Sequence, residues 1–167
     1  MPASNQGIDR RRYALIPRTL IFLTRADELL LIKGALDKGL FAGLYNGIGG
    51  HVERGEDVLS AARRELQEES GYTADELWLC GTVTVDVEIE TGVAIFVFRG
   101  ETARTQPVGS AEGDLVWVPQ STVYTLPLVE DLRILLPQVL AARRGEPPFA
   151  AHYSYDPAGE ITIRFGE

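Results

Sequence analysis

The chain has 167 residues, a length that fits one domain with its own hydrophobic core. Its 24 acidic residues outnumber the 16 basic ones and give a net charge of −8, which argues against a protein that holds nucleic acid. The longest apolar run, Val93 to Phe98, is far shorter than the ~20 residues of a membrane-spanning helix, so we expect no membrane segment. A polar, basic start and a single cysteine, Cys80, predict a cytoplasmic protein without disulfides.

The first elements in the chain are predicted to be strands around a glycine-rich loop. Residues 1–11 predict a flexible N-terminal arm, and residues 12–167 a single domain. Strand-forming residues at Tyr13–Thr24 and Leu29–Lys33 predict two strands. Six glycines between Gly39 and Gly55 exclude a helix there and predict tight turns.

The clearest helix is expected over Asp57–Ser70, because its first residue can cap the start and Gly71 can end it. Val58, Ala62 and Leu66 recur at four-residue spacing within this segment. Such spacing predicts that these three side chains face the core.

The second half of the chain predicts more strands and one further helix. The expected strands are Leu77–Glu90, Val93–Arg99, Asp114–Val118, Ala150–Tyr155 and Glu160–Phe165. The first two would be joined by a turn at Thr91-Gly92, and a helix is expected over Asp131–Arg144, kinked or divided at Pro137. Strands that do not alternate regularly with helices predict an α+β fold with a mixed β-sheet.

Acidic residues concentrate in the first helix and in the loop before it. Eight acids and three arginines between Glu53 and Glu76 give a local charge of −5. Glu68 and Glu69 share a helix face with Glu65, at a cost of roughly 0.2–0.5 kcal/mol per like-charged pair. The cluster is either a solvated face or a site for a cation. Carboxylate and carbonyl oxygens suit Mg²⁺ or Mn²⁺, which would support attack of water on phosphorus.

The order and spacing of these residues resemble the Nudix box. The matching positions are Gly50, five residues, Glu56, seven residues, and then Arg64-Glu65-Leu66-Gln67-Glu68-Glu69-Ser70-Gly71-Tyr72. Tyr72 departs from the pattern, which has an aliphatic residue there, and we expect it to affect packing. The resemblance implies a Nudix-like α/β/α sandwich and hydrolysis of a nucleoside diphosphate linked to another group, with Mg²⁺ or Mn²⁺ as cofactor.

The resemblance also implies a role for each residue of the box. The implied metal ligands are the three glutamates of the helix and the carbonyl oxygen of the loop glycine: Glu65, Glu68, Glu69 and Gly50. One of the glutamates, with Glu65 as the first candidate, would also help to deprotonate water. Glu56 and Arg64 would position the helix.

The stretch Ala42–Gly50 resembles the lead-in of the MutT-type 8-oxo-dGTP diphosphatases. This resemblance implies that Asn46 reads the edge of a purine and that the acidic pair Glu130-Asp131 completes the contact. Lys33 and Lys38 are candidates for contacts with phosphate. The expected partner is therefore a nucleotide, with a purine nucleoside triphosphate, oxidised or not, hydrolysed to monophosphate and pyrophosphate.

Each of these features has a second interpretation. Asn46 precedes a glycine and can be a turn residue, and Glu130-Asp131 can open the following helix. The aromatic residues of the C-terminal hairpin resemble those of the MutT branch, but they can equally form core: Phe149, Tyr153 and Tyr155. ADP-ribose or another nucleotide sugar is the alternative substrate, and a non-catalytic, nucleotide-sensing module is a third possibility. Four points stay open: the role of Glu112 as an extra carboxylate, the base, the metal, and the choice of monomer or homodimer.

Overall fold

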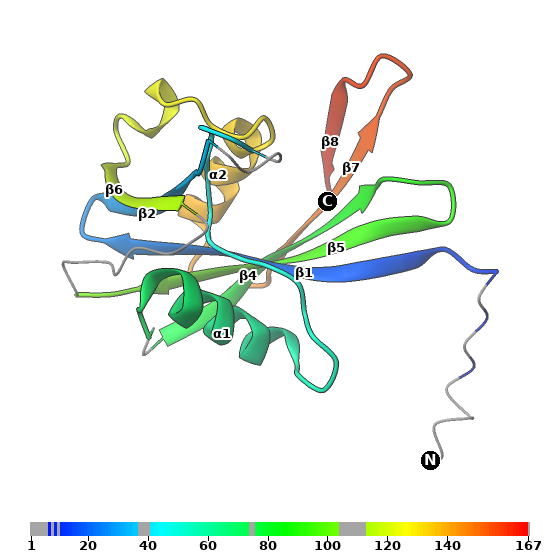
Figure 1. Cartoon of the computed structure of the whole chain (residues 1–167), viewed down its shortest axis with the longest axis horizontal. Helices are drawn as coiled ribbons and strands as arrows, with labels where there is room; N and C mark the ends of the chain where they lie inside the picture. Colours follow the sequence, from blue (N-terminus) through cyan, green and yellow to red (C-terminus); the bar gives the residue numbers. More distant parts are fainter. Residues whose placement is uncertain are drawn as a thin grey trace.

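A mixed β-sheet lies between two α-helices in the described part of the chain (Figure 1). The computed structural model describes residues 7, 9, 11–36, 41–73, 76–103 and 113–166. Most of the predicted N-terminal arm, Lys38 and Glu112 lie outside these residues. Neither described α-helix has the length and the apolar character needed to cross a membrane.

Eight strands build the sheet that the described residues form. They are β1 (Ala14–Arg25), β2 (Glu28–Gly34), β3 (Tyr45–Asn46), β4 (Glu76–Asp86), β5 (Thr91–Glu101), β6 (Gly113–Pro119), β7 (Phe149–Tyr155) and β8 (Ile161–Phe165). Their order is β3-β2-β1-β5-β4-β7-β8, and β6 pairs with β2. The pairs β1·β5 and β4·β7 are parallel and the others are antiparallel, so the predicted mixed sheet is confirmed.

Helix α1 (Val58–Ser70) begins and ends where the sequence predicted. One carboxylate oxygen of Asp57 accepts hydrogen bonds from the backbone N–H groups of Leu59 (2.9 Å) and Ser60 (3.0 Å). Gly71 ends the helix in the left-handed conformation, with φ of 67°. Both ends therefore satisfy backbone groups that a helix leaves without partners.

The buried face of α1 matches the predicted stripe in two of three positions. Ala62 and Leu66 are fully buried, whereas Val58 at the first turn is half-buried. Ala61, which the spacing did not select, is also fully buried. The helix thus contacts the sheet through a wider band than one residue per turn.

The hairpin between β4 and β5 turns earlier than the sequence predicted. The turn lies at residues 87–90, where Glu88 N donates to Thr91 O (2.9 Å), and the expected turn at Thr91-Gly92 is wrong. Thr91 and Gly92 instead begin β5, because they pair with Ala14 and Leu15 of β1. Pairing with a distant strand has overridden a local turn signal.

Helix α2 (Leu132–Ala141) is shorter than the predicted segment and is not divided at Pro137. The side chain of Arg99 on β5 contacts its C-terminal end, and its Nη1 donates to the carbonyls of Leu140 and Ala142 at 2.8 Å each. These bonds satisfy carbonyls at the end of the helix. A 3₁₀ turn, η2 (Val123–Thr125), and the two-residue strand β3 were not predicted.

Two hydrophobic clusters occupy opposite faces of the sheet. Ile21 and Leu23 of β1 pack in the cluster that contains α1, whereas Phe22 packs in the cluster that contains α2. This alternation follows from the two-residue period of a strand. Figure 1 shows α1 and α2 on opposite sides of the sheet, which confirms the expected sandwich.

Candidate functional site

Arg64 on α1 holds three carboxylates around its guanidinium group. Its Nη2 lies 2.7 Å from Glu56 Oε1, and its Nη1 lies 2.8 Å from Glu65 Oε1 and 3.2 Å from Glu68 Oε2. The hydrogen bonds with Glu56 and Glu65 raise the pKa of Arg64, and the hydrogen bond from Arg64 lowers the pKa of Glu56. Arg64 and Glu56 therefore stay charged together at neutral pH.

The same ion pairs fasten the loop before α1 to the helix. Glu56 also accepts a hydrogen bond from Glu53 N (2.7 Å), and Arg64 Nη2 donates to the carbonyl of His51 (3.0 Å). The structure thus brings together Glu56 and Arg64, the two residues expected to position the helix. Their contacts fix the loop relative to the first turns of α1.

Gly50 packs directly against the carboxylate of Glu65. A side chain at this position would overlap the carboxylate of Glu65, whose side chain is only 13% exposed. The Gly50 carbonyl accepts a hydrogen bond from Thr19 N on β1 (2.8 Å) and keeps a second lone pair for another partner. Glu68, in contrast, is 60% exposed and points into solvent.

The carboxylate and carbonyl oxygens of the cluster suit a hard divalent cation, although the described carboxylates do not surround a common point. No three carboxylate, imidazole or thiol groups of the described residues lie in a metal-binding arrangement. Arg64 instead contacts an oxygen of both Glu65 and Glu68. Four glutamates against one arginine leave an excess of negative charge, and carboxylate oxygens are the ligands that Mg²⁺ and Mn²⁺ prefer. The residues therefore fit the implied metal.

A cavity of about 370 Å³ lies on the opposite face of the sheet. Its lining combines apolar residues of the α2-side cluster with a few polar groups, namely Arg18, Glu130, Asp131, Tyr153 and Tyr155. The volume and the mixture of an apolar floor with few polar groups are typical of a small-molecule site. We call this cavity the α2-side pocket.

Backbone pairing places the acidic pair at this pocket. Tyr45 N donates to Pro127 O (2.9 Å), and Val129 N donates to Tyr45 O (3.0 Å). The segment that leads to Glu130-Asp131 therefore lies beside β3, and Tyr45 pairs with it by a parallel bridge at Leu128. Both carboxylates line the α2-side pocket.

Asp131 and Tyr153 form the most buried polar part of the pocket. Burial raises the pKa of Asp131, and the charge of Glu130 adds to this rise. Burial also raises the pKa of Tyr153, as does the negative charge of Asp131. The Tyr153 hydroxyl is close enough for the charge of Asp131 to act on it, but it has no partner in hydrogen-bond geometry among the described residues.

The remaining predicted substrate contacts lie elsewhere. Asn46 on β3 does not line the α2-side pocket; its Oδ1 accepts a hydrogen bond from Gly47 N (2.8 Å), the role of a turn residue. Lys33 Nζ lies 5.8 Å from the centre of the Tyr45 ring, and Lys33 does not line the α2-side pocket. Lys38 lies outside the described residues.

Arg18 lines the α2-side pocket and was not among the predicted site residues. The sequence does carry a signal for it. On β1 the residues two apart, Ile16, Leu20 and Phe22, are apolar, and Arg18 interrupts this face of the strand with a charge. A charged residue on the inward face of a strand requires a partner or a ligand.

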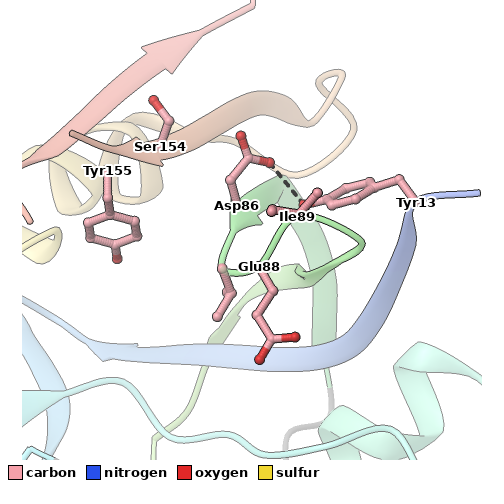
Figure 2. A pocket seen from close by; sticks show the side chains of 7 residues that line it. Tyr13, Asp86, Glu88, Ile89, Ser154 and Tyr155 are labelled. Atoms are coloured by element: carbon pink, nitrogen blue, oxygen red, sulfur yellow. Dashed lines mark hydrogen bonds between the residues drawn. The ribbon is translucent and has the colours of Figure 1, made fainter. Parts of the chain in front are cut away.

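A second cavity, of about 880 Å³, lies at the tip of the β4–β5 hairpin, and its lining contains none of the box residues. Figure 2 shows it as an open hollow between β1, this hairpin and β7. Tyr13 donates a hydrogen bond to Asp86 (2.9 Å), whose other oxygen lies 3.1 Å from His152 Nε2. This group joins β1, β4 and β7, and we assign it a structural role.

The NUDIX domain profile matches residues 14–139, three quarters of the chain. The chain belongs to the NUDIX family of hydrolases. The oxidized purine nucleoside triphosphate hydrolase of Danio rerio is 37% identical over 100 residues, which cover 59% of this chain and 63% of the relative. The protein of the same name from Mus musculus is 28% identical over 138 residues, 82% of this chain and 85% of the relative.

Solved structures agree with this assignment at the level of the NUDIX fold. A MutT protein from Bacillus halodurans superposes with a TM-score of 0.76 at 24% identity, over 90% of this chain and 97% of its own. The NUDIX domain of Shewanella oneidensis NrtR, solved with ADP ribose, superposes with a TM-score of 0.69 at 18% identity, over 84% and 97%. Both structures thus share the architecture of this chain.

Proposed function

We propose that this Nudix hydrolase converts purine nucleoside triphosphates to the monophosphate and pyrophosphate, with oxidised purines such as that of 8-oxo-dGTP as preferred bases. The observation that carries the proposal is the position of two sites on either side of β1. The glutamates of α1 and the loop glycine lie against one side of the strand, and the α2-side pocket lies on the other. The names of the Danio rerio and Mus musculus relatives support the choice of substrate.

At the glutamate cluster, Glu65, Glu68, Glu69 and the Gly50 carbonyl would hold Mg²⁺ or Mn²⁺. When bound, such a cation neutralises phosphate oxygens and makes water more acidic. Glu65, half enclosed by Gly50, would accept the proton of the attacking water as the new P–O bond forms. Arg64 and Glu56 would keep the loop and the helix in register, and the pyrophosphate oxygen leaves as the P–O bridge breaks.

At the α2-side pocket, apolar residues would enclose the base and the carboxylates would read its N–H groups. Asp131 and Glu130 are suited to a purine because a carboxylate accepts, and a protonated carboxyl donates, a hydrogen bond. Asn46 does not line the pocket, so its contact with the base would require its side chain to turn away from its bond with Gly47 N. The cytoplasm, which holds the nucleotide pool, is the expected place of action.

Product analysis on a nucleotide panel tests this proposal. The protein is incubated with dGTP, 8-oxo-dGTP, dATP, dCTP and ADP-ribose, with Mg²⁺ or Mn²⁺. We expect pyrophosphate and a monophosphate from purine triphosphates, with the highest kcat/KM for 8-oxo-dGTP, and no product from Glu68→Gln. Preferred cleavage of ADP-ribose to AMP and ribose phosphate would favour the alternative substrate. A lack of turnover on every nucleotide would contradict the proposal and favour a sensing module.

A further inference from the structure

Arg18 is a charged group in an otherwise apolar part of the α2-side pocket, and it has no partner among the residues that the structure describes. The residue is half-buried, and its guanidinium makes no hydrogen bond or ion pair with any described residue. Its neighbour across the parallel pair is Ile95 of β5, which also lines the pocket. A half-buried arginine facing an apolar wall loses hydration without compensation, so a ligand anion is the partner that its position favours.

The backbone of Arg18 places it beside the glutamate cluster. On either side of it, Thr19 N donates to Gly50 O (2.8 Å) and Val52 N donates to Pro17 O (3.1 Å). Arg18 itself forms an isolated bridge with His51. Arg18 is therefore the pocket residue on the strand that adjoins the loop of the Nudix box.

Arg18 and the acidic pair line the same pocket from different elements: Arg18 lies on β1, and Glu130 and Asp131 follow the segment that pairs with Tyr45 of β3. Tyr153 lies on β7, and the negative charge of Asp131 acts on its hydroxyl. Strands β5 and β4 lie between β7 and β1 in the sheet. Arg18, Asp131 and Tyr153 all line this one pocket, so a single bound molecule can reach both Arg18 and the acidic pair.

From this arrangement we propose that Arg18 binds the phosphate nearest the ribose of the bound nucleotide. The inference rests on the proposed function and adds a residue that selects nucleotides over nucleosides. A base at Glu130-Asp131 directs its ribose toward β1, and the phosphate chain then passes Arg18 to reach Glu65. The planar guanidinium can donate two parallel hydrogen bonds to one phosphate. The arginine also offsets the repulsion between the phosphate and an acidic chain.

Binding of deoxyguanosine and dGMP, which differ only in the phosphate, tests the proposal directly. Dissociation constants are measured by calorimetry for the unsubstituted chain, Arg18→Gln and Arg18→Lys. We expect Arg18→Gln to weaken dGMP binding roughly 10- to 100-fold and to leave deoxyguanosine unchanged. Arg18→Lys should lie in between, because it keeps the charge and loses the two-pronged contact.

Arg164→Gln is the matched control. Arg164 is exposed on β8, and its neighbours Ile163 and Phe165 pack toward the α2-side cluster, so Arg164 faces the opposite side. This variant should bind both ligands like the unsubstituted chain, and melting curves establish that all variants fold.

The possible results separate the two proposals. Equal weakening of dGMP and deoxyguanosine by Arg18→Gln, or weakening of neither, overturns the role of Arg18. If the unsubstituted chain hydrolyses triphosphates but Arg18→Gln keeps its KM, the proposed function stands and the role of Arg18 fails. If Arg18→Gln does not fold, the comparison of Arg18→Lys with the unsubstituted chain decides in the same way.

Discussion

At the scale of single residues, Gly50 matters because its lack of a side chain leaves room for the carboxylate of Glu65. Because the Glu65 carboxylate occupies the place of a Cβ, Gly50→Ala should displace this carboxylate. We expect a fall in kcat of at least tenfold with little change in melting temperature, since the flexible end of Glu65 can move without disturbing the core. Steady-state kinetics and thermal melts measure the two effects.

The control for this prediction is Gly166→Ala, where the nearest atoms to an added Cβ lie at 3.6 Å or more. This variant should keep the kcat of the unsubstituted chain. Full activity of Gly50→Ala would show that the position of Glu65 does not matter for turnover.

Cys80 is the second residue whose environment gives a measurable result. The thiol is 2% exposed, and burial raises its pKa to about 12. At pH 8 only about one thiol in 10⁴ is then ionised, compared with about one in four for a free cysteine. We expect an aromatic disulfide reagent to label Cys80 only after the chain unfolds in guanidinium chloride. Rapid labelling of the native protein would contradict the burial.

The sequence indicates which residues of the box lie side by side more directly than which residues line the pocket. Glu56, Arg64 and Glu65 are close in sequence, and a helix places residues that are close in sequence next to each other in space. Arg18 and Asp131 meet in one pocket only through the pairing of strands far apart in sequence, which no local pattern encodes. Tyr72, the departure from the box, was expected to affect packing; it is 1% exposed and contacts the Trp117 ring edge-to-face at 6.2 Å.

At the scale of elements, helix α1 depends on the left-handed residue at its end. Gly71→Ala places a Cβ in that conformation at a cost of about 1 kcal/mol. For a domain of this size such a cost lowers the melting temperature by roughly 2–4 °C. Gly71→Asn should lose less, because asparagine tolerates left-handed φ. Thermal melts of the two variants check the order, and equal losses would contradict it.

Element boundaries show where local signals were outweighed. The sequence predicted both ends of α1, since Asp57 and Gly71 supply hydrogen bonds within the helix itself. It missed the end of α2, because Arg99, more than 30 residues away, donates hydrogen bonds to the last carbonyls of this helix. The misplaced turn before β5 has the same origin, since β1 fixes the first residues of that strand.

At the scale of the whole molecule, a divalent cation bound to the glutamate cluster should stabilise the fold by mass action. At ten times the dissociation constant the gain is about 1.4 kcal/mol, or roughly 3–6 °C in melting temperature. Glu68→Gln should reduce this shift while changing the metal-free melting temperature little, because Glu68 is largely exposed. Glu160→Gln, in the exposed turn before β8, should shift like the unsubstituted chain.

Melting curves at increasing Mg²⁺ or Mn²⁺ concentration measure these shifts. An equal shift for the unsubstituted chain and Glu68→Gln would remove Glu68 from the metal site. The absence of any shift with either ion would contradict a metal site on α1.

The C-terminal hairpin β7–β8 contributes residues to the α2-side pocket and none to the glutamate cluster. The NUDIX profile match ends at residue 139, yet Tyr153, Tyr155 and Ile161 of this hairpin line the α2-side pocket. Among the described residues, this hairpin pairs with the rest of the sheet through β7 and β4. If the pocket binds the base as proposed, insertions and substitutions in the hairpin would change which base is accepted while Gly50 and Glu65 keep their contact. An exchange of this hairpin would then alter selectivity and leave the glutamate cluster in place.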